Sequence, residues 1–303
     1  MTLPPRAVVV HRASELDELV DRHGTRGQVE FFLRTRGRTL ADVQARHDAL
    51  HEALRAVSAA IPPEWRRGAA ERSDLHRFGF GPEDVVVVVG PDGLVANTAK
   101  YLSGQPVVGV DPEPGRNPGV LVTFTSDQVG HALGEVARGR ARWQDRAMVR
   151  ATLDDGTMLD ALNDLYLGDV GHQSARYVLG LSDGRTERQS SSGLIVATGT
   201  GATGWATSIA RDRGGAALPG ADSADLAWFV REAWPSPTSG TSLTMGVLHP
   251  GEALEVLVQS DSLVVFGDGL EPDRLTATWG QSVRLAVSER RLRLVLPART
   301  RAR

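Results

Sequence analysis

The sequence predicts two domains: a three-layer, Rossmann-like α/β domain (residues 1–142) and a β-sandwich-like domain of antiparallel strands (residues 143–303). Three observations predict this organisation. Short β-branched runs alternate with segments of helical spacing in the first half of the chain. After residue 143, short alternating strands follow one another, separated by Gly, Asp and Ser turns. A chain of 303 residues is also long enough for two domains with separate cores.

The first domain is predicted around residues 84–89, where an aspartate is followed by five consecutive valines. Such a run indicates a strand that is buried on both faces, as in a parallel sheet. Apolar spacing or composition predicts the other elements. We expect strands at 7–10, 106–111 and 119–124, and helices at 40–60, 95–102 and 127–138. A charged, arginine-rich segment follows the first strand.

The second domain is predicted from its alternating apolar residues, which are typical of strands with one buried face. We expect these strands at 148–153, 176–181, 254–258, 262–266, 274–278, 283–287 and 292–296. One helical interruption is expected, where the strand 193–198 leads through a turn at 199–204 into a helix at 205–210. The basic residues 299–303 are expected to form a frayed end.

The composition excludes several classes of protein. Hydrophobic content of 41% and charged content of 23% are typical of a soluble globular protein. A net charge of −3 argues against a general nucleic-acid binder, and the absence of cysteine excludes disulfides and thiolate metal sites. No apolar run approaches the ~20 residues that span a bilayer, and no signal peptide is evident. We therefore expect a cytoplasmic protein without nucleic-acid or membrane partners.

Lysine and histidine give weaker signals. Lys100 is the only lysine among 34 basic residues, so the chain has no Walker A motif and is no P-loop phosphotransferase. Lys100 itself is expected on a solvated helix surface. His47 and His51 are four residues apart on the helix 40–60, a spacing that can bind a metal. Because no third ligand is near in the sequence, we expect a solvated helix and no metal site.

Asp92 is the first candidate for chemistry. It lies in the turn Gly90-Pro91-Asp92-Gly93, directly after the buried strand, and open parallel sheets bind ligands at the carboxyl ends of their strands. Unpaired burial of a carboxylate is costly, but this edge of the sheet is where ligands bind. The alternative is that Asp92 caps the following helix or shapes the turn, as aspartate commonly does.

The second candidate is the threonine- and glycine-rich turn at 199–204. Small residues let the backbone approach a ligand closely, and N–H groups at a helix start can face an anion. The hydroxyls of Thr198, Thr200 and Thr203 add possible donors. Glycine and threonine are also common at helix starts, so this turn alone is not specific.

Two shorter motifs complete the set of candidates. Asn163 and Asp164 interrupt an apolar run, either as ligand contacts or as turn and capping residues. Asp268 lies between two glycines, either at a ligand or simply in a hairpin turn.

In order and spacing, these motifs resemble the NAD kinase family, from Val8 to the last strands. That family has a strand leading into Gly-Gly-Asp-Gly-Thr, then an Asn-Glu pair, a Gly-Leu strand into a threonine-rich turn, and a late Asp-Gly turn. The corresponding segments here are 90–94, Asn163-Asp164, 193–203 and Asp268-Gly269. The mitochondrial type is the most similar branch. It is matched by residues 107–111, 161–163, 191–194 and 198–201 and by Trp205.

The resemblance implies transfer of the terminal phosphoryl group of ATP, or of polyphosphate, to the 2′-hydroxyl of the adenosine ribose of NAD. It implies Mg²⁺ as the cofactor, NAD and ATP as ligands, and a homodimer or larger homo-oligomer. It also implies that Asp92 is the catalytic residue and accepts the proton of the ribose hydroxyl. Ligand-binding positions implied in the same way are Gly90, Gly93, Asn163, Asp164, Ser192, Gly193, Thr198, Thr200, Thr203 and Asp268.

Three positions depart from the family motif. Pro91 replaces a glycine and removes an N–H, Leu94 replaces a threonine and removes a hydroxyl, and Asp164 replaces a glutamate. One charge-assisted hydrogen bond is worth about 1.5–3 kcal/mol, so the first two changes weaken phosphate binding. Two alternatives therefore stay open: a non-catalytic nucleotide-binding descendant with a regulatory role, and a kinase of the same superfamily with a different acceptor.

Overall fold

The structure is a computed structural model that describes residues 4–116 and 119–298. It contains two compact units: unit 1 is Met1–Gln144 with the segment from Arg293 on, and unit 2 is Asp145–Leu292. Unit 1 is an α/β structure and unit 2 consists mainly of antiparallel strands, which is the predicted fold class. The predicted boundary after residue 142 differs from this division, because the end of the last strand returns to unit 1. The predicted basic end, 299–303, lies outside the described residues.

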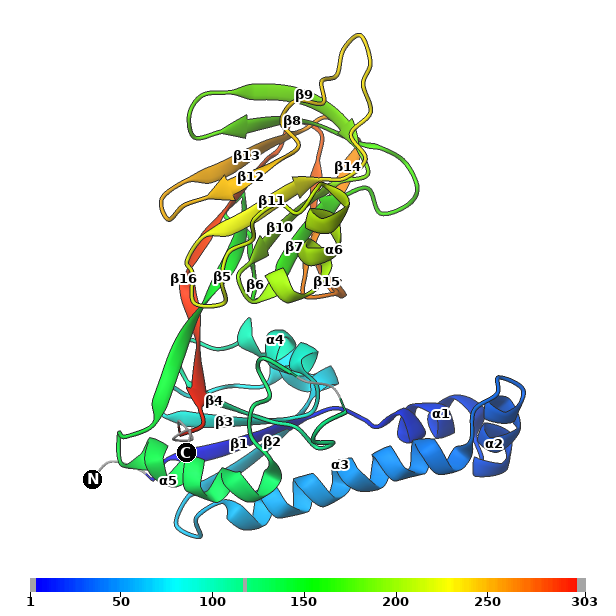
Figure 1. The fold of residues 1–303 in the computed structure, drawn as a ribbon, viewed down its shortest axis with the longest axis vertical. Coiled ribbons are helices and arrows are strands. Elements are labelled where there is room, and N and C mark those ends of the chain that lie inside the picture. Colours follow the sequence, from blue (N-terminus) through cyan, green and yellow to red (C-terminus); the bar gives the residue numbers. More distant parts are fainter. Residues whose placement is uncertain (1–3, 117–118, 299–303) are drawn as a thin grey trace. The chain divides into compact units, whose positions relative to one another are not determined.

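Unit 1 is built on parallel strands in the order β2-β1-β3-β4 (Figure 1). Every residue of β3 is buried, as the run of valines predicts for a central strand. The last strand, β16 (Ser282–Leu296), pairs in parallel with β4 through Arg293 and Leu294. The strands are β1 (Arg6–His11), β2 (Arg66–Glu71), β3 (Asp84–Val89) and β4 (Pro106–Val110).

Helices cover both faces of these strands. α3 (Leu40–Ala60) and α5 (Val129–Ala137) lie on one face, and α4 (Asp92–Ala99) lies on the other (Figure 1). Val57 of α3 and Leu133 of α5 are fully buried against Val87 of β3 and its neighbours. Short 3₁₀ helices lie at Arg72–Arg77 and Ser126–Gln128. The bounds of α3 are those predicted, but α4 begins three residues before the predicted helix and ends at Ala99.

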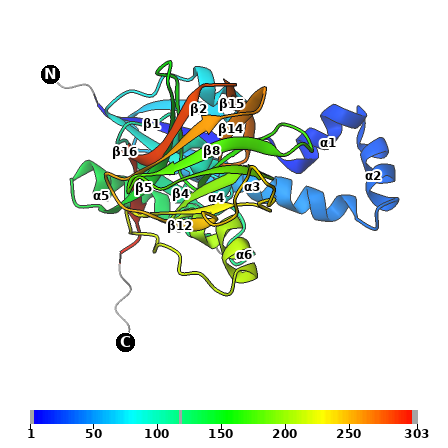
Figure 2. The same cartoon turned by 90° about the horizontal axis from the view of Figure 1, so that it is seen from above.

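The charged segment after β1 forms two helices that the apolar pattern did not predict, α1 (Glu15–His23) and α2 (Arg26–Arg34). Figures 1 and 2 show both beside the N-terminal part of α3, away from the strands. They share a small core with that helix, made of Leu16, Leu19, Val29, Leu33 and Val43. Each helix starts with a capping hydroxyl, because Ser14 and Thr25 accept the N–H of Asp17 and Gln28.

The predicted strand at 119–124 is wrong. This segment is a loop that packs on β4 at Gly109 and pairs with it through an isolated bridge between Val110 and Phe124. The N–H groups of residues 120–122 bind the carboxylate of Asp92 instead of a neighbouring strand. The prediction for Lys100 is also wrong, because this residue is buried, with 8% of its surface exposed, directly after α4.

Unit 2 packs two antiparallel sheets face to face. One contains β8-β9, β13, β5-β6 and most of β16, and the other has the order β12-β11-β10-β7-β14-β15. Alternate residues of both sheets meet in one core, for example Tyr177, Val196, Val256 and Val265. The strands are β5 (Arg142–Leu153), β6 (Met158–Ala161), β7 (Asp164–Gly168), β8 (Ala175–Leu181), β9 (Thr186–Ser191), β10 (Leu194–Thr198), β11 (Leu226–Val230), β12 (Met245–Leu248), β13 (Ala253–Val258), β14 (Ser262–Gly267) and β15 (Leu270–Thr278).

A short helix covers the outer face of the second sheet. α6 (Trp205–Asp212) buries Ala206 and Ala210 against Ala227 and Phe229 of β11. The strand, turn and helix predicted for 193–210 are all present. The two strands predicted at 283–287 and 292–296 are one continuous strand, β16. No helix among the described residues is long and apolar enough to cross a bilayer.

Candidate functional site

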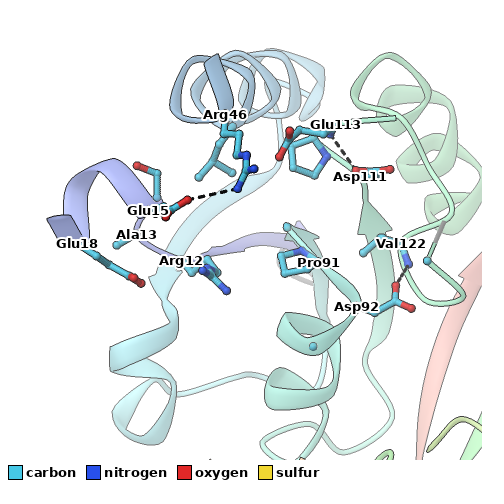
Figure 3. A pocket seen from close by; sticks show the side chains of 16 residues that line it. Arg12, Ala13, Glu15, Glu18, Arg46, Pro91, Asp92, Asp111, Glu113 and Val122 are labelled. Atoms are coloured by element: carbon cyan, nitrogen blue, oxygen red, sulfur yellow. Dashed lines mark hydrogen bonds and ion pairs between the residues drawn. The ribbon is translucent and has the colours of Figure 1, made fainter. Parts of the chain in front are cut away.

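A cavity of about 620 Å³ in unit 1 lies over the turn between β3 and α4 (Figure 3). Gly90, Pro91, Asp92 and Gly93 line it on one side, and Arg46 of α3 points into it from another. Gly90 has φ = +154°, and a Cβ at this position would lie 3.0 Å from Cδ2 of Leu94. The turn therefore needs glycine at its first position, where the chain leaves the sheet.

Asp92 is the first residue of α4, and its side chain is half-buried. Its Oδ2 accepts the N–H of Val120 at 2.7 Å, and its Oδ1 accepts those of Leu121 and Val122, both at 3.0 Å. A carboxylate offers about four acceptor positions, so these bonds leave roughly one, on Oδ2. Asp92 thus holds the loop 119–122 beside the cavity. Its role as a catalytic base stays a prediction.

The cavity wall carries charges of both signs. Arg12 and Arg46 face it together with Glu15, Asp111 and Glu113 (Figure 3). Nη1 of Arg46 lies 3.3 Å from Oε2 of Glu15, whose pKa is lowered mainly by its hydrogen bond to Arg38. Nε of Arg46 is buried and has no hydrogen-bond partner among the described residues. A guanidinium with an unused N–H is suited to bind a carboxylate or phosphate.

The two residues that depart from the family turn differ in position. Pro91 is exposed and lines the cavity. Leu94 is only 2% exposed and packs inward beside Gly90, so it does not line the cavity. Pro91 is therefore the departure that removes an N–H at the cavity itself.

The structure brings three of the predicted motifs in unit 2 together. Asp268 accepts the N–H of Leu162 at 2.9 Å and that of Asn163 at 2.7 Å. Oγ1 of Thr198 donates to the carbonyl of Leu162 at 2.6 Å, and it accepts the N–H groups of Thr200 and Gly201 at 3.1 and 3.2 Å. Asp268 and Thr198 therefore fix the loop 162–164 against the turn 199–204. Contact of either residue with a ligand stays a prediction.

In this part of unit 2 the hydroxyl of Thr200 is buried and the carboxyl of Asp164 is half-buried, and neither fixes the backbone in this way. Burial raises the pKa of Asp164 to about 6, so its carboxyl group is easily protonated near neutral pH. Thr200 is 3% exposed, and its Oγ1 has no hydrogen-bond partner among the described residues. Buried polar groups are nearly always paired, so these two are the strongest candidates for ligand contacts in unit 2.

Ser192 and Gly193 do not join this cluster. They precede β10, whereas the threonine turn follows it, and five residues of extended chain span about 17 Å. The carbonyl of Ser192 instead accepts the hydroxyl of Tyr166, at 3.1 Å. Ligand binding by Ser192 and Gly193 stays a prediction.

An aromatic group in unit 2 was not predicted as part of the site. The ring of Tyr166 is nearly parallel to that of Trp205, with centroids 6.1 Å apart, and Trp205 is 39% exposed. The guanidinium of Arg231 lies 5.2 Å from the centre of the Trp205 ring. Alternation along β7 provides a signal, because Tyr166 lies between the core residues Leu165 and Leu167 and so faces away from the core.

These units define a two-domain protein in which an α/β domain with a glycine–aspartate turn is combined with a β-sandwich. The sequence is similar to the NAD kinase of Chlorobaculum tepidum, with 28% identity over 46% of this chain and 47% of that protein. It is 29% identical to the NAD kinase of Teredinibacter turnerae over 71% of both chains. It is also 27% identical to the mitochondrial NAD kinase 2 of Rattus norvegicus, over 42% of this chain and 41% of that protein.

The fold is also similar to that of a solved structure. A crystal structure of yeast NADH kinase complexed with NADH matches 97% of this chain and 84% of its own, with a TM-score of 0.62 and 14% identity. No family model matches the sequence. The sequence is therefore similar to those of NAD kinases, as its motifs predict, and the fold is similar to that of the yeast enzyme. It matches less than half the length of the Chlorobaculum and rat proteins.

Proposed function

We propose that this protein is an NAD kinase-like phosphotransferase that uses ATP to phosphorylate the 2′-hydroxyl of the adenosine ribose of NAD, giving NADP. The observation that carries this proposal is the position of Asp92, a half-buried carboxylate in a glycine-containing turn that lines a cavity at the carboxyl end of β3. Sequence similarity to NAD kinases and the fold shared with yeast NADH kinase support it.

The residues of unit 1 supply positioning and charge in this proposal. Phosphoryl transfer needs an oriented acceptor hydroxyl and neutralisation of the phosphate charge. The remaining acceptor position of Asp92, on Oδ2, would take the proton of the ribose hydroxyl, and the N–H bonds from Val120 to Val122 would keep the carboxylate oriented. The guanidinium groups of Arg12 and Arg46 would bind phosphate oxygens.

The residues of unit 2 would bind the dinucleotide. The buried hydroxyl of Thr200 and the half-buried carboxyl of Asp164 are suited to bind ribose or amide groups. Asn163 adds an amide beside them. The threonine turn would shape the pocket, since Thr198 holds its backbone in place.

Magnesium fits the donor set of unit 1. In nucleotide enzymes this ion is usually bound by one or two carboxylates together with phosphate oxygens and water. Asp111 lines the cavity and would hold an ion carried in on the phosphates of ATP. The bound ion would neutralise phosphate charge during transfer. A homodimer or larger homo-oligomer and a cytoplasmic location also belong to this proposal.

A second candidate function is nucleotide binding without catalysis. The geometry of Asp92 favours it, because three backbone N–H groups already occupy most of its acceptor positions. Pro91 and Leu94 also remove two family donors, and Leu94 is buried in the core. In this case the turn would bind a nucleotide and transmit its presence to a partner.

The two candidates are separated by incubating the protein with ATP, Mg²⁺ and NAD and measuring NADP. The kinase proposal expects NADP to form, and it expects Asp92→Asn to reduce the turnover about 100-fold or more. Nucleotide binding by calorimetry without any NADP would favour the second candidate. Absence of both NADP and binding, tested with NAD, NADH, NADP and ATP at millimolar concentration, would refute both. Glu18→Gln is the matched control, because it removes an exposed carboxylate from the same cavity and has no part in the proposed transfer.

A further inference from the structure

The start of α1 and the exposed side of α3 bring three metal-ligating side chains together. Asp17, His47 and His51 each place one ligand atom within 4.8 Å of the others. His47 and His51 lie on successive turns of α3, and their ring centroids are 4.1 Å apart. The third ligand that the histidine pair lacked in the sequence comes from α1, thirty residues earlier in the chain. The expectation of a merely solvated helix face is therefore incomplete.

The distances suit a small transition-metal ion. Zinc binds imidazole nitrogen and carboxylate oxygen at about 2.0–2.2 Å, so two of its ligands at the tetrahedral angle are about 3.4 Å apart. Oδ1 of Asp17 and Nδ1 of His47 are 3.5 Å apart. A metal ion fits between these two atoms without a large movement of either helix.

Asp17 is held in the orientation that such a site needs. Its Oδ2 accepts the backbone N–H of Ser14 at 2.9 Å and the hydroxyl of Ser14 at 2.8 Å, which leaves Oδ1 facing His47. The same Ser14 hydroxyl lies 2.8 Å from Nδ1 of His47, and a metal ion bound to this nitrogen would replace that contact while Ser14 continues to hold Asp17. Groups that fix a ligand through a second hydrogen bond are a regular part of metal sites.

The local network without a metal accounts for only part of this arrangement. Ser14 caps α1 and explains the positions of Asp17 and His47. It does not engage His51, which is partly exposed and whose ring lies against that of His47. Two imidazoles and a carboxylate converging from two helices are a typical ligand set for zinc, nickel or cobalt.

We propose that Asp17, His47 and His51 bind one divalent transition-metal ion, with Zn²⁺ as the preferred ion and water at the remaining position. The ion would join α1 to α3. The cavity of unit 1 is lined by residues close to these ligands in the same two helices: Glu15, Glu18, Arg46 and Leu50. Metal binding would therefore fix one wall of that cavity, and it does not depend on the proposed kinase activity.

The test is calorimetric titration of the metal-free protein with ZnCl₂. The expected result is one ion per chain for the wild type. Removing even an outer-shell partner of a metal commonly costs about 10–100-fold in affinity, so losing a ligand should cost at least that much. His51→Ala and Asp17→Asn are the informative variants, because His51 is partly exposed and asparagine keeps an oxygen that can accept the N–H of Ser14.

His172→Ala is the matched control, because His172 is an exposed histidine of unit 2 that lies outside the cluster. It should bind zinc like the wild type. Zinc should also raise the melting temperature of the wild type and of His172→Ala but not of His51→Ala, and Co²⁺ should give a visible absorption band only in the first two. Equal zinc affinity of the wild type, His51→Ala and Asp17→Asn would overturn the proposal, as would absence of one-to-one binding.

Discussion

Replacing Asp92 by asparagine tests whether this side chain holds the loop 119–122 in place. The carboxylate accepts three N–H bonds, from Val120 on one oxygen and from Leu121 and Val122 on the other. Asparagine has nearly the same shape, but one oxygen is replaced by an NH₂ group that can only donate. Whichever side this group occupies, at least one backbone N–H loses its acceptor.

The size of the effect follows from these bonds. A hydrogen bond to a charged group is worth about 1.5–3 kcal/mol, and the bonds that remain weaken because the acceptor becomes neutral. Asp92 is only half-buried, so we take the lower part of this range, a loss of about 2 kcal/mol in the free energy of opening the loop. Because 1.4 kcal/mol corresponds to a factor of ten, the three amide hydrogens should exchange about 30-fold faster.

Hydrogen–deuterium exchange of a peptide that covers residues 119–124 measures this rate. Asp111→Asn should leave the rate unchanged, because Oδ1 of Asp111 accepts a single N–H, that of Glu113. Unchanged exchange in Asp92→Asn would refute the anchoring role. If turnover of NAD falls while NAD affinity is kept, Asp92 also acts as the base. Equal losses of affinity and turnover would assign its whole contribution to the loop.

Three further changes test the site. Thr198→Val removes three bonds of a fully buried hydroxyl and should lower the free energy of unfolding by about 2–4 kcal/mol in urea, whereas Thr203→Val, which removes one exposed bond, should cost less than about 1 kcal/mol. Burial raises the pKa of Asp164 from 3.8 to about 6, so the folded state holds this proton more tightly and stability falls as the pH rises from about 4 to 6. Asp164→Asn should remove this fall and gain up to about 3 kcal/mol at pH 7, measured by urea unfolding at pH 4 and 7; a constant difference between the proteins would contradict the raised pKa. Pro91→Gly restores an N–H at the cavity and should raise phosphoryl transfer to NAD about 10-fold through the affinity for ATP, whereas Leu94→Thr at a buried position should instead cost about 2–4 kcal/mol of stability. An unchanged steady-state rate of NAD phosphorylation in Pro91→Gly would show that the missing N–H at residue 91 does not limit phosphoryl transfer.

The parts of the fold that local pattern determines were predictable. The valines of β3 indicate a strand that is buried on both faces, and the apolar spacing of α3 indicates a helix that is buried along one side. Both elements have the expected bounds. The segment 119–124 is just as apolar, but its N–H groups bind Asp92, twenty-eight or more residues away in sequence. Local pattern contains no information on such a distant acceptor, so the strand prediction was wrong.

The same limit applies to the site. The position directly after β3 was enough to identify Asp92 as a candidate site residue. The order of the motifs identified Asn163, Asp164 and the threonine turn as further candidates. The sequence could not show that the side-chain oxygens of Thr198 and Asp268 accept backbone N–H groups, because these hydrogen bonds depend on how three separate loops meet. It could not place Asp17 beside His47 either, since the capped helix α1 was hidden in a charged segment.

The path of β16 has a consequence for the order in which the protein folds during synthesis. Unit 2 is one continuous stretch of chain, whereas unit 1 consists of two pieces. β4 pairs with β3 on one side, and its other side pairs with β16 at Arg293 and Leu294. Domains generally fold as units as the chain emerges, from the N-terminus onward. Here unit 1 is synthesised first but completed last, because its sheet includes residues that are translated after all of unit 2. Until then part of the edge of β4 stays open, and a ribosome that stalls before residue 293 leaves an exposed strand that is prone to pair with other chains.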